Sequence, residues 1–556
     1  MNEVCFTTDF QKALALADQF RSVYTEDDGR LPECEQVVAP DSFCNISITD
    51  QDIIYAIQSM NADSAPGPDL VHGHFIKNVY CYLIQPLKLL FRKCIENGSV
   101  PEEWKKGIIV PLYKKNKKPE NPSSYRPVCL TSIICKLLER IVHKYLMVYL
   151  KQKDLISPSQ HAFLAKKSTG TNLIECLNDW TQLIDAKKPV DVVYIDLAKA
   201  FDSVSLQKLL FRLRKIGIGG PLMEFFRSFL IGRSNCVRIK RVYSPYEPVL
   251  SGIPQGTILG PALFILYINS IAEIPTSSTI QLYADDAKLY RGISSDEDAE
   301  QMQNDLSRVC DYFRDWQLNI NTEKCELIHI GQINRHNNYL LDGQNIQTEQ
   351  NCRDLGVKVS EDAKFSQHCN EIARSAFFRL KQMNISFSCK NKDFKLLLFK
   401  TYIRPLLENN TYVWSPHLLK DIDKIESVQR LFTRQMGNLR QYSYMERLRI
   451  LNLESLEARR IMFDLVFLYK IVNSLVEIER ESFFTMNSGN TRGHKFKINV
   501  QYARTNYRKY FFVNRTVRIW NLLPANIVDC NSVASFKLKL KSYDLNRFCR
   551  GRALMT

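Results

Sequence analysis

Two adjacent carboxylates, Asp285 and Asp286, are the residues of this chain whose spacing best suits chemistry. They stand between two short apolar runs, residues 280–282 and 287–290. Apolar flanks around a polar turn predict a tight β-hairpin with the acidic pair near its tip. Hard divalent cations such as Mg²⁺ prefer carboxylate oxygens, so the pair is a candidate metal ligand. For an acidic pair considered alone, a solvated surface turn is the alternative.

A third aspartate, Asp196, gives the pair a partner. It follows the β-branched run at residues 191–195, which predicts a strand that carries Asp196 at its carboxyl end. The turn-rich loop at residues 252–261 lies between the two acidic segments and leads into the apolar run 262–268. We therefore expect carboxylates from two different strands to share one metal site.

This ordered set resembles the palm motifs of the reverse transcriptase family. Asp196, Pro254-Gln255-Gly256 and Tyr283-Ala284-Asp285-Asp286 match the first, second and third motifs, most closely those of non-LTR (LINE-like, jockey and CR1-type) retrotransposons. The resemblance covers roughly residues 60–440, and more weakly the C-terminal tail. It implies an α+β right-hand polymerase with fingers, a palm with an antiparallel sheet, a helical thumb and a basic C-terminal region. The expected boundaries are 1–60 for an N-terminal helical extension, 61–345 for fingers and palm, 346–485 for the primer grip, thumb and connection, and 494–556 for the basic region.

The resemblance implies RNA-directed DNA synthesis. Deoxynucleotides would be added to a primer 3′-hydroxyl on an RNA template by two-metal-ion phosphoryl transfer. Asp196, Asp285 and Asp286 are expected to hold two Mg²⁺ ions, with Mn²⁺ as an alternative. Lys324 matches the lysine proposed to protonate the departing pyrophosphate. The expected partners are an RNA template, a DNA primer or target, and dNTPs.

The resemblance also places the contacts to the substrate's phosphates. Arg126 matches the fingers arginine, and its forked donors suit phosphate oxygens. Lys114 is our choice for the fingers lysine, although the sequence allows Lys115 equally. Contacts to template or primer are expected from Lys166, Lys167, Leu355 and Gly356.

The resemblance also indicates which residues contact the sugar and base of the nucleotide. Phe201, five positions after Asp196, matches the aromatic residue that would clash with a 2′-hydroxyl, which predicts selection of deoxynucleotides. Ordinary core packing is the alternative for this ring. Gln255 and Gly256 are expected to form the floor beneath the nascent base pair, where glycine lets the backbone come close.

Helical periodicity and turn signals predict the elements that position these residues. Residues 1–60 predict two amphipathic helices, the second capped at Thr49. Apolar spacing predicts helices at residues 132–151 and 296–316, and mainly helical structure at 365–440. His161 is expected to be structural, and residues 486–493 are the best linker candidate.

The net charge of +16 is concentrated near the C-terminus. Residues 491–556 contain fourteen Lys or Arg and two Asp, a net charge of +12. A basic region predicts a polyanionic partner and binding that weakens with salt. A solvated basic surface is the alternative. Aromatic rings interleaved with the cations favour stacking on single strands, although Trp520 is expected in the core. These rings are Phe496, Tyr502, Tyr507, Tyr510, Phe511, Phe512 and Trp520.

Composition excludes several other classes of protein. The 556 residues, 45% hydrophobic and 24% charged, predict a folded chain of several domains. No apolar run approaches the ~20 residues of a membrane span. The 16 cysteines include no Cys-x-x-Cys, which argues against a zinc knuckle and for a reduced intracellular setting. Nucleus and cytoplasm are the compartments that the resemblance implies.

Two other functions fit parts of the sequence, but its residues disfavour both. A decayed nucleic-acid-binding remnant is disfavoured because the motif residues are intact. An RNA-directed RNA polymerase is disfavoured by Phe201 and by Ala284, where glycine would precede the acidic pair.

Only ~60 residues precede the fingers, against ~100–200 for a typical domain. The endonuclease that usually precedes this kind of polymerase is therefore expected to be absent.

Overall fold

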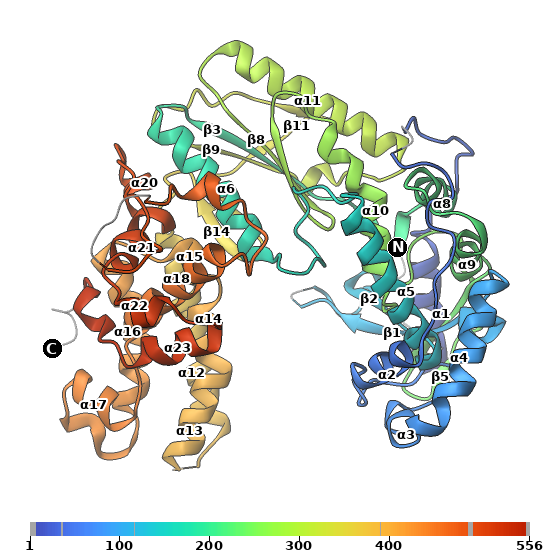
Figure 1. Ribbon diagram of the computed structural model, residues 1–556, viewed down its shortest axis with the longest axis horizontal. Coiled ribbons are helices and arrows are strands. Elements are labelled where there is room, and N and C mark those ends of the chain that lie inside the picture. Colours follow the sequence, from blue (N-terminus) through green and yellow to red (C-terminus); the bar gives the residue numbers. More distant parts are fainter. Residues whose placement is uncertain (1–6, 35–36, 116, 390, 488–492, 552–556) are drawn as a thin grey trace.

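The computed structural model describes residues 7–34, 37–115, 117–389, 391–487 and 493–551. Two arms stand on either side of a central sheet, so the molecule forms an arch (Figure 1). The long helix α11 (Asp296–Asp315) crosses the top of the arch. Parts of the predicted N-terminal extension (1–60), linker (486–493) and basic region (494–556) lie outside the described residues.

The first arm contains most of the N-terminal half of the chain. Thr49 begins its second helix with a capping box, because Thr49 accepts the N–H of Asp52 and the Asp52 carboxylate accepts the N–H of Thr49. The predicted cap is therefore confirmed. The helices of this arm are α1 (Asp9–Arg21), α2 (Asp50–Gln58), α3 (Gly73–Asn78), α4 (Tyr80–Glu96), α5 (Ile133–Gln152), α8 (Leu206–Lys215) and α9 (Gly220–Leu230).

A small mixed sheet completes the first arm. Its strand order is β2-β1-β4-β5, with β6 also paired to β4. The hairpin formed by β1 and β2 pairs Leu112 with Arg126, and the N–H of Lys114 donates to the carbonyl of Ser124 at 2.8 Å. Lys114 and Arg126 therefore stand close together at the end of this hairpin. The strands are β1 (Lys106–Tyr113), β2 (Tyr125–Leu130), β4 (Ser234–Ile239), β5 (Val242–Tyr243) and β6 (Glu247–Pro248).

The central sheet has the strand order β12-β9-β3-β8-β7. The strand β3 is antiparallel to both of its neighbours, and β7 and β8 form the predicted hairpin. The strand before Asp196 and the hairpin around Asp285 are therefore confirmed. The strands are β3 (Val190–Ile195), β7 (Thr279–Tyr283), β8 (Asp286–Gly292), β9 (Glu326–Ile330) and β12 (Gln347–Thr348).

Both faces of the central sheet are buried, and the two faces belong to different hydrophobic clusters. Alternate side chains of a strand point to opposite faces. Val193 and Ile195 accordingly join the cluster of the first arm and α11, whereas Val190 and Val192 join the cluster of α6 (Thr169–Asp185) and the second arm. The sheet is thus the wall between two separately packed halves of the protein. The short helix α7 (Ala200–Ser203) and the buried helix α10 (Gly260–Ile268) flank it on the side of the first arm.

The second arm is helical, as predicted for residues 365–440. Two short hairpins lead into it from the sheet: β10 (Leu340–Leu341) with β11 (Gln344–Asn345), and β13 (Asn351–Asp354) with β14 (Val357–Ser360). Its helices are α12 (Ser366–Ser386), α13 (Lys392–Leu398), α14 (Arg404–Glu408), α15 (Thr411–Trp414), α16 (Leu419–Arg434), α17 (Tyr444–Ile450), α18 (Leu456–Val472) and α19 (Arg480–Phe483).

The basic C-terminal residues pack onto this arm. The side chains of Phe511, Phe512 and Trp520 are almost fully buried in the same cluster as α18. The core prediction for Trp520 is confirmed, but the stacking interpretation is wrong for Phe511 and Phe512. The helices here are α20 (Asn506–Tyr510), α21 (Phe512–Trp520), α22 (Ala525–Val528) and α23 (Val533–Lys541).

Two of the C-terminal cations make internal contacts. The guanidinium of Arg508 donates to Asn178 Oδ1 at 2.9 Å on α6, and its burial lowers the pKa of Arg508 to about 10. The guanidinium of Arg515 forms a two-bond ion pair with Asp464 on α18, at 2.8 and 3.0 Å. These contacts connect the C-terminal region to α6, which packs against the central sheet, and to the second arm. No helix among the described residues is both long and apolar enough to pass through a bilayer.

The burial of Trp520 predicts that the C-terminal region is needed for stability. Trp520→Ala should lower the free energy of unfolding by about 3–5 kcal/mol, because a large core ring leaves a cavity. Chemical denaturation followed by circular dichroism measures this loss. Tyr502→Ala is the matched control, since Tyr502 is 84% exposed and its removal should cost no more than about 0.5 kcal/mol. Equal stability of the two variants would contradict the packing described above.

Candidate active site

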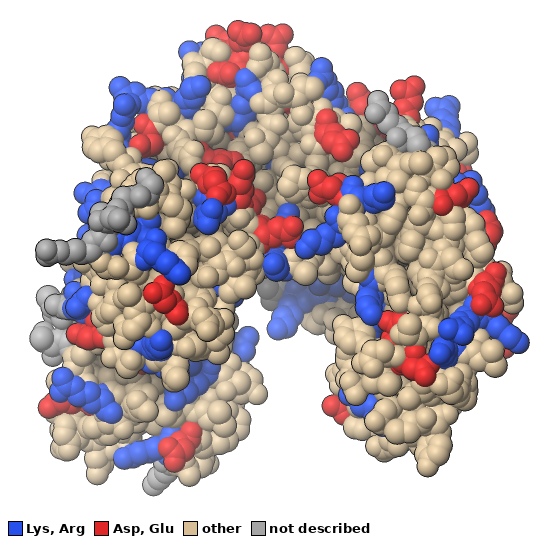
Figure 2. Space-filling model, viewed as in Figure 1, with Lys and Arg blue, Asp and Glu red and all other residues tan. Residues whose placement is uncertain are grey.

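A cleft of about 1130 Å³ opens where the first arm meets the central sheet. It brings together residues that the sequence places far apart. Figure 2 shows the hollow between the two arms, with Lys and Arg side chains gathered beneath the roof of the arch. The predicted site residues that line the cleft are Lys114, Lys115, Arg126, Asp196, Phe201, Gln255, Gly256, Asp285 and Lys324.

Asp196 lies directly after β3 and is held by the segment that precedes β9. Its backbone carbonyl accepts the N–H of Asn321 at 2.8 Å. Its carboxylate Oδ2 accepts a charged hydrogen bond from Lys324 Nζ at 3.1 Å, and both side chains remain accessible. The predicted proton donor and the predicted metal ligand are therefore direct neighbours.

The tip of the β7–β8 hairpin is fixed by a buried glutamine. Tyr283 pairs with Asp286, so Ala284 and Asp285 form a two-residue turn in which Ala284 has a φ of +56°. Gln160 Oε1 accepts the N–H of Ala284 at 3.1 Å, and Gln160 is fully buried. The sequence gives Gln160 no such role, because nothing local connects it to a turn that lies 124 residues further along the chain.

Burial and repulsion between carboxylates act in the same direction at this tip. Burial, followed by the negative charge of Asp196, raises the pKa of Asp285. Partial burial and the charges of Asp285 and Asp196 raise the pKa of Asp286 to about 6. The Asp286 residue as a whole remains exposed at the surface. Asp286 does not line the cleft, whereas Asp196 and Asp285 do.

This donor set fits a hard divalent cation. Carboxylate oxygens from β3 and from the hairpin converge, and a cation would relieve their mutual repulsion. Within the described parts of the chain, no group of three or more His, Cys, Asp or Glu side chains forms a ready-made metal cage. Asp196 and Asp285 line the cleft, and Asp286 adds charge beside them.

Cations also gather in the cleft. Burial, followed by the positive charges of Arg126 and Lys199, lowers the pKa of Lys114. Lys114 Nζ also donates to the carbonyl of Ser123 at 3.1 Å. Such a cluster of like charges suits a polyanion such as a triphosphate. Lys115 lines the cleft as well, and Lys199 is a member of the cluster that the sequence analysis missed.

Phe201 combines the two alternatives that the sequence leaves open. Its ring stacks on Phe264 of α10, with centroids 4.2 Å apart, and it also lines the cleft. Its carbonyl accepts the N–H of Ile253 at 2.8 Å, which connects it to the loop that carries Gln255. The ring is therefore fixed in position by the core while one part of it faces the cleft.

The loop at Gln255 and Gly256 is held against the first arm. Gln255 Nε2 donates to Asp202 Oδ1 at 2.7 Å, and burial raises the pKa of Asp202. Gly256 has a φ of +108°, and a Cβ placed there would lie 2.4 Å from the carbonyl oxygen of Cys129. Only glycine fits this close approach. Asp202 is a second residue that the sequence analysis did not single out.

Several predicted residues lie away from the cleft. Lys166 Nζ donates to the carbonyl of Ser474 at 3.1 Å, and Lys167 Nζ donates to the carbonyl of Gln160 at 3.0 Å. Leu355 and Gly356 form the β13–β14 turn, both with positive φ. Their template and primer contacts stay predictions. His161 is buried between Thr171 and Glu175, at 2.9 and 3.1 Å, which agrees with a structural role.

The N-terminal helix also reaches the cleft. Gln19 and Phe20 of α1, together with Val23, form part of its lining. Phe20 is buried against Ile109 of β1 and Val237 of β4, which fixes the helix to the small sheet. The sequence predicted this helix but not its contribution to the site.

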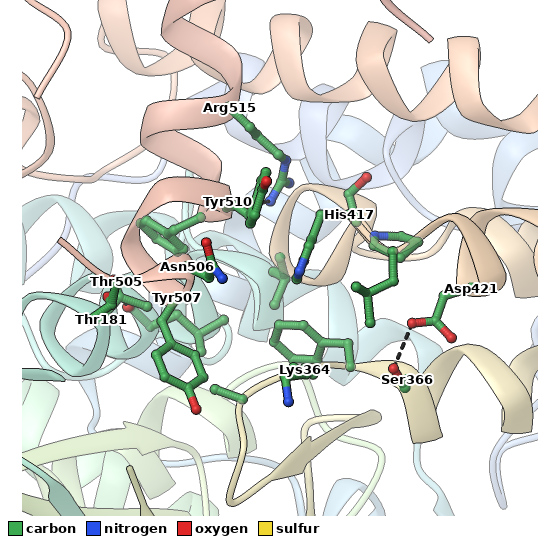
Figure 3. Close-up of a pocket in the computed structure, with 18 of the residues that line it drawn as sticks. Thr181, Lys364, Ser366, His417, Asp421, Thr505, Asn506, Tyr507, Tyr510 and Arg515 are labelled. Carbon is green, nitrogen blue, oxygen red and sulfur yellow. Dashed lines mark hydrogen bonds between the residues drawn. The ribbon is translucent and has the colours of Figure 1, made fainter. Parts of the chain in front are cut away.

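A second, smaller hollow of about 360 Å³ lies where α6, the second arm and the C-terminal helices meet (Figure 3). The rings of His417 and Tyr510 stack there with centroids 4.1 Å apart. Tyr507 and Lys364 stand beside each other at its lower edge (Figure 3). Tyr507 and Tyr510 are thus two C-terminal rings that remain accessible.

Comparison with known proteins shows which family the central part of the chain resembles. Residues 113–359 match the family model described as reverse transcriptase (RNA-dependent DNA polymerase). This segment contains β2, the whole central sheet and most of the residues that line the cleft, so this part of the chain matches a reverse transcriptase domain.

The chain is related, at low identity, to polymerases of Drosophila melanogaster mobile elements. It is 25% identical over 405 residues to the RNA-directed DNA polymerase from mobile element jockey, covering 70% of this chain and 44% of that protein. It is 24% identical over 408 residues to the probable RNA-directed DNA polymerase from transposon BS, covering 70% and 45%. It is 24% identical over 392 residues to the probable enzyme from transposon X-element, covering 69% and 43%. The chain thus spans less than half of the length of these relatives.

The raised pKa of Asp285 predicts a measurable effect on stability. A folded pKa above the unfolded value means that ionisation opposes folding at neutral pH. Asp285→Asn should therefore unfold at the same or a higher temperature than the wild type without divalent cations. Added Mg²⁺ should raise the melting temperature of the wild type more than that of the variant. Differential scanning fluorimetry measures both shifts.

The control for this comparison is Asp311→Asn. Asp311 is exposed on α11 and pairs with Arg314, away from the cleft. Its variant should keep the full response to Mg²⁺. If Asp285→Asn responds as strongly as the control, Asp285 does not hold the cation.

Proposed function

We propose that this chain is the RNA-directed DNA polymerase of a non-LTR retrotransposon. It would add dNTPs to the 3′-hydroxyl of a DNA primer paired with an RNA template. The observation that carries the proposal is the cleft, in which Asp196 and Asp285 face the cations Lys114 and Arg126. Acidic groups on one side and basic groups on the other are what a metal–nucleotide complex requires. The family match and the relatives support this function.

The arrangement of the arch supports a right-hand division of the chain. We assign the fingers and palm to residues 61–345, with the first arm as fingers and the central sheet as palm. Residues 346–485 would form the primer grip, thumb and connection, which includes the β13–β14 hairpin and the helices of the second arm. Residues 1–60 are the N-terminal extension that contributes α1 to the cleft, and residues 494–556 are the basic region.

The chain's own residues would act mainly by positioning and by stabilising charge. Asp196 and Asp285, with Asp286 beside them, would hold two Mg²⁺ ions. Such ions, when bound, activate the attacking hydroxyl and stabilise the leaving pyrophosphate. Lys114 and Arg126 would bind the phosphates of the incoming nucleotide.

Two further side chains would complete the reaction centre. Lys324, held by Asp196, stands where it would give a proton to the leaving pyrophosphate oxygen. Phe201, fixed against Phe264, would exclude a 2′-hydroxyl.

Primer extension tests the proposal directly. The full chain is incubated with an RNA template, an annealed DNA primer, Mg²⁺ and dNTPs, and products are resolved by length. The wild type should extend the primer, and Asp285→Asn should extend it at least about 10²–10³-fold more slowly. Extension by neither protein would favour a non-catalytic remnant. Extension with NTPs but not dNTPs would favour an RNA polymerase.

Sugar selection predicts the behaviour of Phe201→Ala. Removing the ring should raise the use of NTPs relative to dNTPs by at least about tenfold, because the steric exclusion is worth more than about 1.4 kcal/mol. The ratio of kcat/KM for dCTP and CTP on an RNA template measures it. Phe264→Leu is the control, since it weakens the packing beneath Phe201 but keeps the ring. An unchanged ratio in Phe201→Ala would show that this ring does not discriminate between deoxyribose and ribose.

We further propose that the basic region binds the phosphate backbone of the template or target. Its exposed cations, together with the accessible rings of Tyr502, Tyr507 and Tyr510, provide charge and stacking surfaces. Because the region also contributes to the core, truncation would remove both its charge and the packing of the second arm. Surface substitutions are therefore the appropriate test.

Neutralising exposed cations of this region should weaken binding and reduce its dependence on salt. Each lost phosphate contact lowers the slope of log K against log salt by about 0.7 for single strands. Fluorescence anisotropy with labelled RNA at several salt concentrations measures the slope. The triple variant is Arg518→Gln, Lys537→Gln and Lys541→Gln, and the control is Lys93→Gln, Lys151→Gln and Lys153→Gln in the first arm. Identical slopes for the two triple variants would refute the assignment.

A further inference from the structure

One buried carboxylate touches both strands that present the acidic residues of the site. Asp354 Oδ2 accepts a bond from Lys288 Nζ at 2.5 Å and from the Tyr194 hydroxyl at 3.3 Å. Lys288 lies on β8, two residues after Asp286. Tyr194 lies on β3, two residues before Asp196.

The register of the sheet explains why one group reaches both strands. Tyr194 and Lys288 are direct partners across β3 and β8, so their side chains point to the same face of the sheet. That face is covered by α6 and by the β13–β14 hairpin. Asp354 is 4% exposed and the Lys288 side chain 5%, so solvent does not weaken the pair.

Asp354 also belongs to a third element, the β13–β14 hairpin. It is the last residue of β13 and pairs with Val357 across the turn formed by Leu355 and Gly356. This turn is the one whose sequence resembles a primer grip. A single carboxylate thus connects both acidic strands to the segment expected to hold the primer.

Stability alone does not account for such a pair. Buried ion pairs are often no better for stability than well-packed apolar residues of the same volume. A buried charge with two partners does, however, impose one relative position on the elements that carry them. At this place in the fold, a fixed relative position is what in-line attack requires, because the hydroxyl and the carboxylates must be aligned within a fraction of an ångström.

We infer that Asp354, through Lys288 and Tyr194, is a positioning residue that sets the alignment of Asp196 and Asp286 with the primer terminus. This inference rests on the proposed polymerase function. Asp354 itself touches neither nucleotide nor reacting atoms, and it is not among the residues that line the cleft. Its loss should therefore reduce turnover without changing how the nucleotide binds.

The chain offers a matched control on the same strand and the same face. Tyr290 lies two residues after Lys288 and donates to Asp179 Oδ2 on α6 at 2.6 Å. It is 2% exposed and its partner Asp179 is partly buried, so Tyr290→Phe removes a largely buried bond from β8. That bond involves α6, however, and neither β3 nor the primer-grip hairpin.

The test compares Asp354→Asn with Tyr290→Phe in steady-state primer extension on RNA. Asp354→Asn should lower kcat by about tenfold or more, the usual cost of losing a group that orients metal ligands, and leave the KM for dNTP within about twofold. Tyr290→Phe should keep both constants. The inference is overturned if kcat is unchanged in Asp354→Asn, if the control loses as much, or if the KM for dNTP rises with the fall in kcat.

A second measurement separates this inference from the proposed function. Binding of Mn²⁺ to the full chain, followed by electron paramagnetic resonance, does not depend on catalysis. Asp354→Asn should weaken it by about tenfold relative to Tyr290→Phe. A wild type that extends no primer would refute the polymerase proposal, while equal Mn²⁺ affinity in the two variants would refute the role of Asp354. If Asp354→Asn fails to fold, the double variant Lys288→Met with Asp354→Leu removes the charges but keeps the volume, and the same outcomes apply.

Discussion

Carboxylates that repel one another must be held side by side in this protein, and much of the remaining structure serves that requirement. Ile195 pairs with Ala287, so the next residues outward, Asp196 and Asp286, face each other at the ends of two adjacent strands. Their repulsion, together with burial, raises the pKa of the acidic tip and opposes folding at neutral pH. A sheet that is apolar on both faces, with Val192 and Leu289 fully buried, provides the rigidity that opposes this repulsion.

The opposite charges come from different elements, and this determines how the site is assembled. Lys114 and Arg126 belong to the β1–β2 hairpin of the first arm, Lys324 precedes β9, and Lys199 precedes α7. Among these four cations, Lys324 forms an ion pair with an acidic residue of the site, Asp196. The remaining positive charges repel one another across open space. Under the proposed function, a substrate that brings both phosphates and divalent cations would relieve the repulsion within both sets at once.

Much of this was readable from the sequence, because the relevant signals are local. The cap at Thr49, the strand before Asp196 and the hairpin at Asp285 each follow from a few consecutive residues. The contacts that hold the site in place are not local. Gln160 and Ala284 are separated by 124 residues, Lys288 and Asp354 by 66, and Asp202 and Gln255 by 53. No periodicity or turn signal connects such pairs, since they are created by the tertiary fold and by the burial of polar groups that need a partner.

The C-terminal residues show why composition alone misassigns roles. Counting cations and rings treats every side chain as exposed, whereas a helix divides them between its faces. In α21, Phe512, Val517 and Trp520 are buried while Arg518 is exposed. The same nine residues therefore contribute to the core of the second arm and present charge to solvent. Under the proposed function, electrostatic binding by this region would be coupled to folding, and changes confined to the exposed face would separate the attraction for nucleic acid from the stability of the arm.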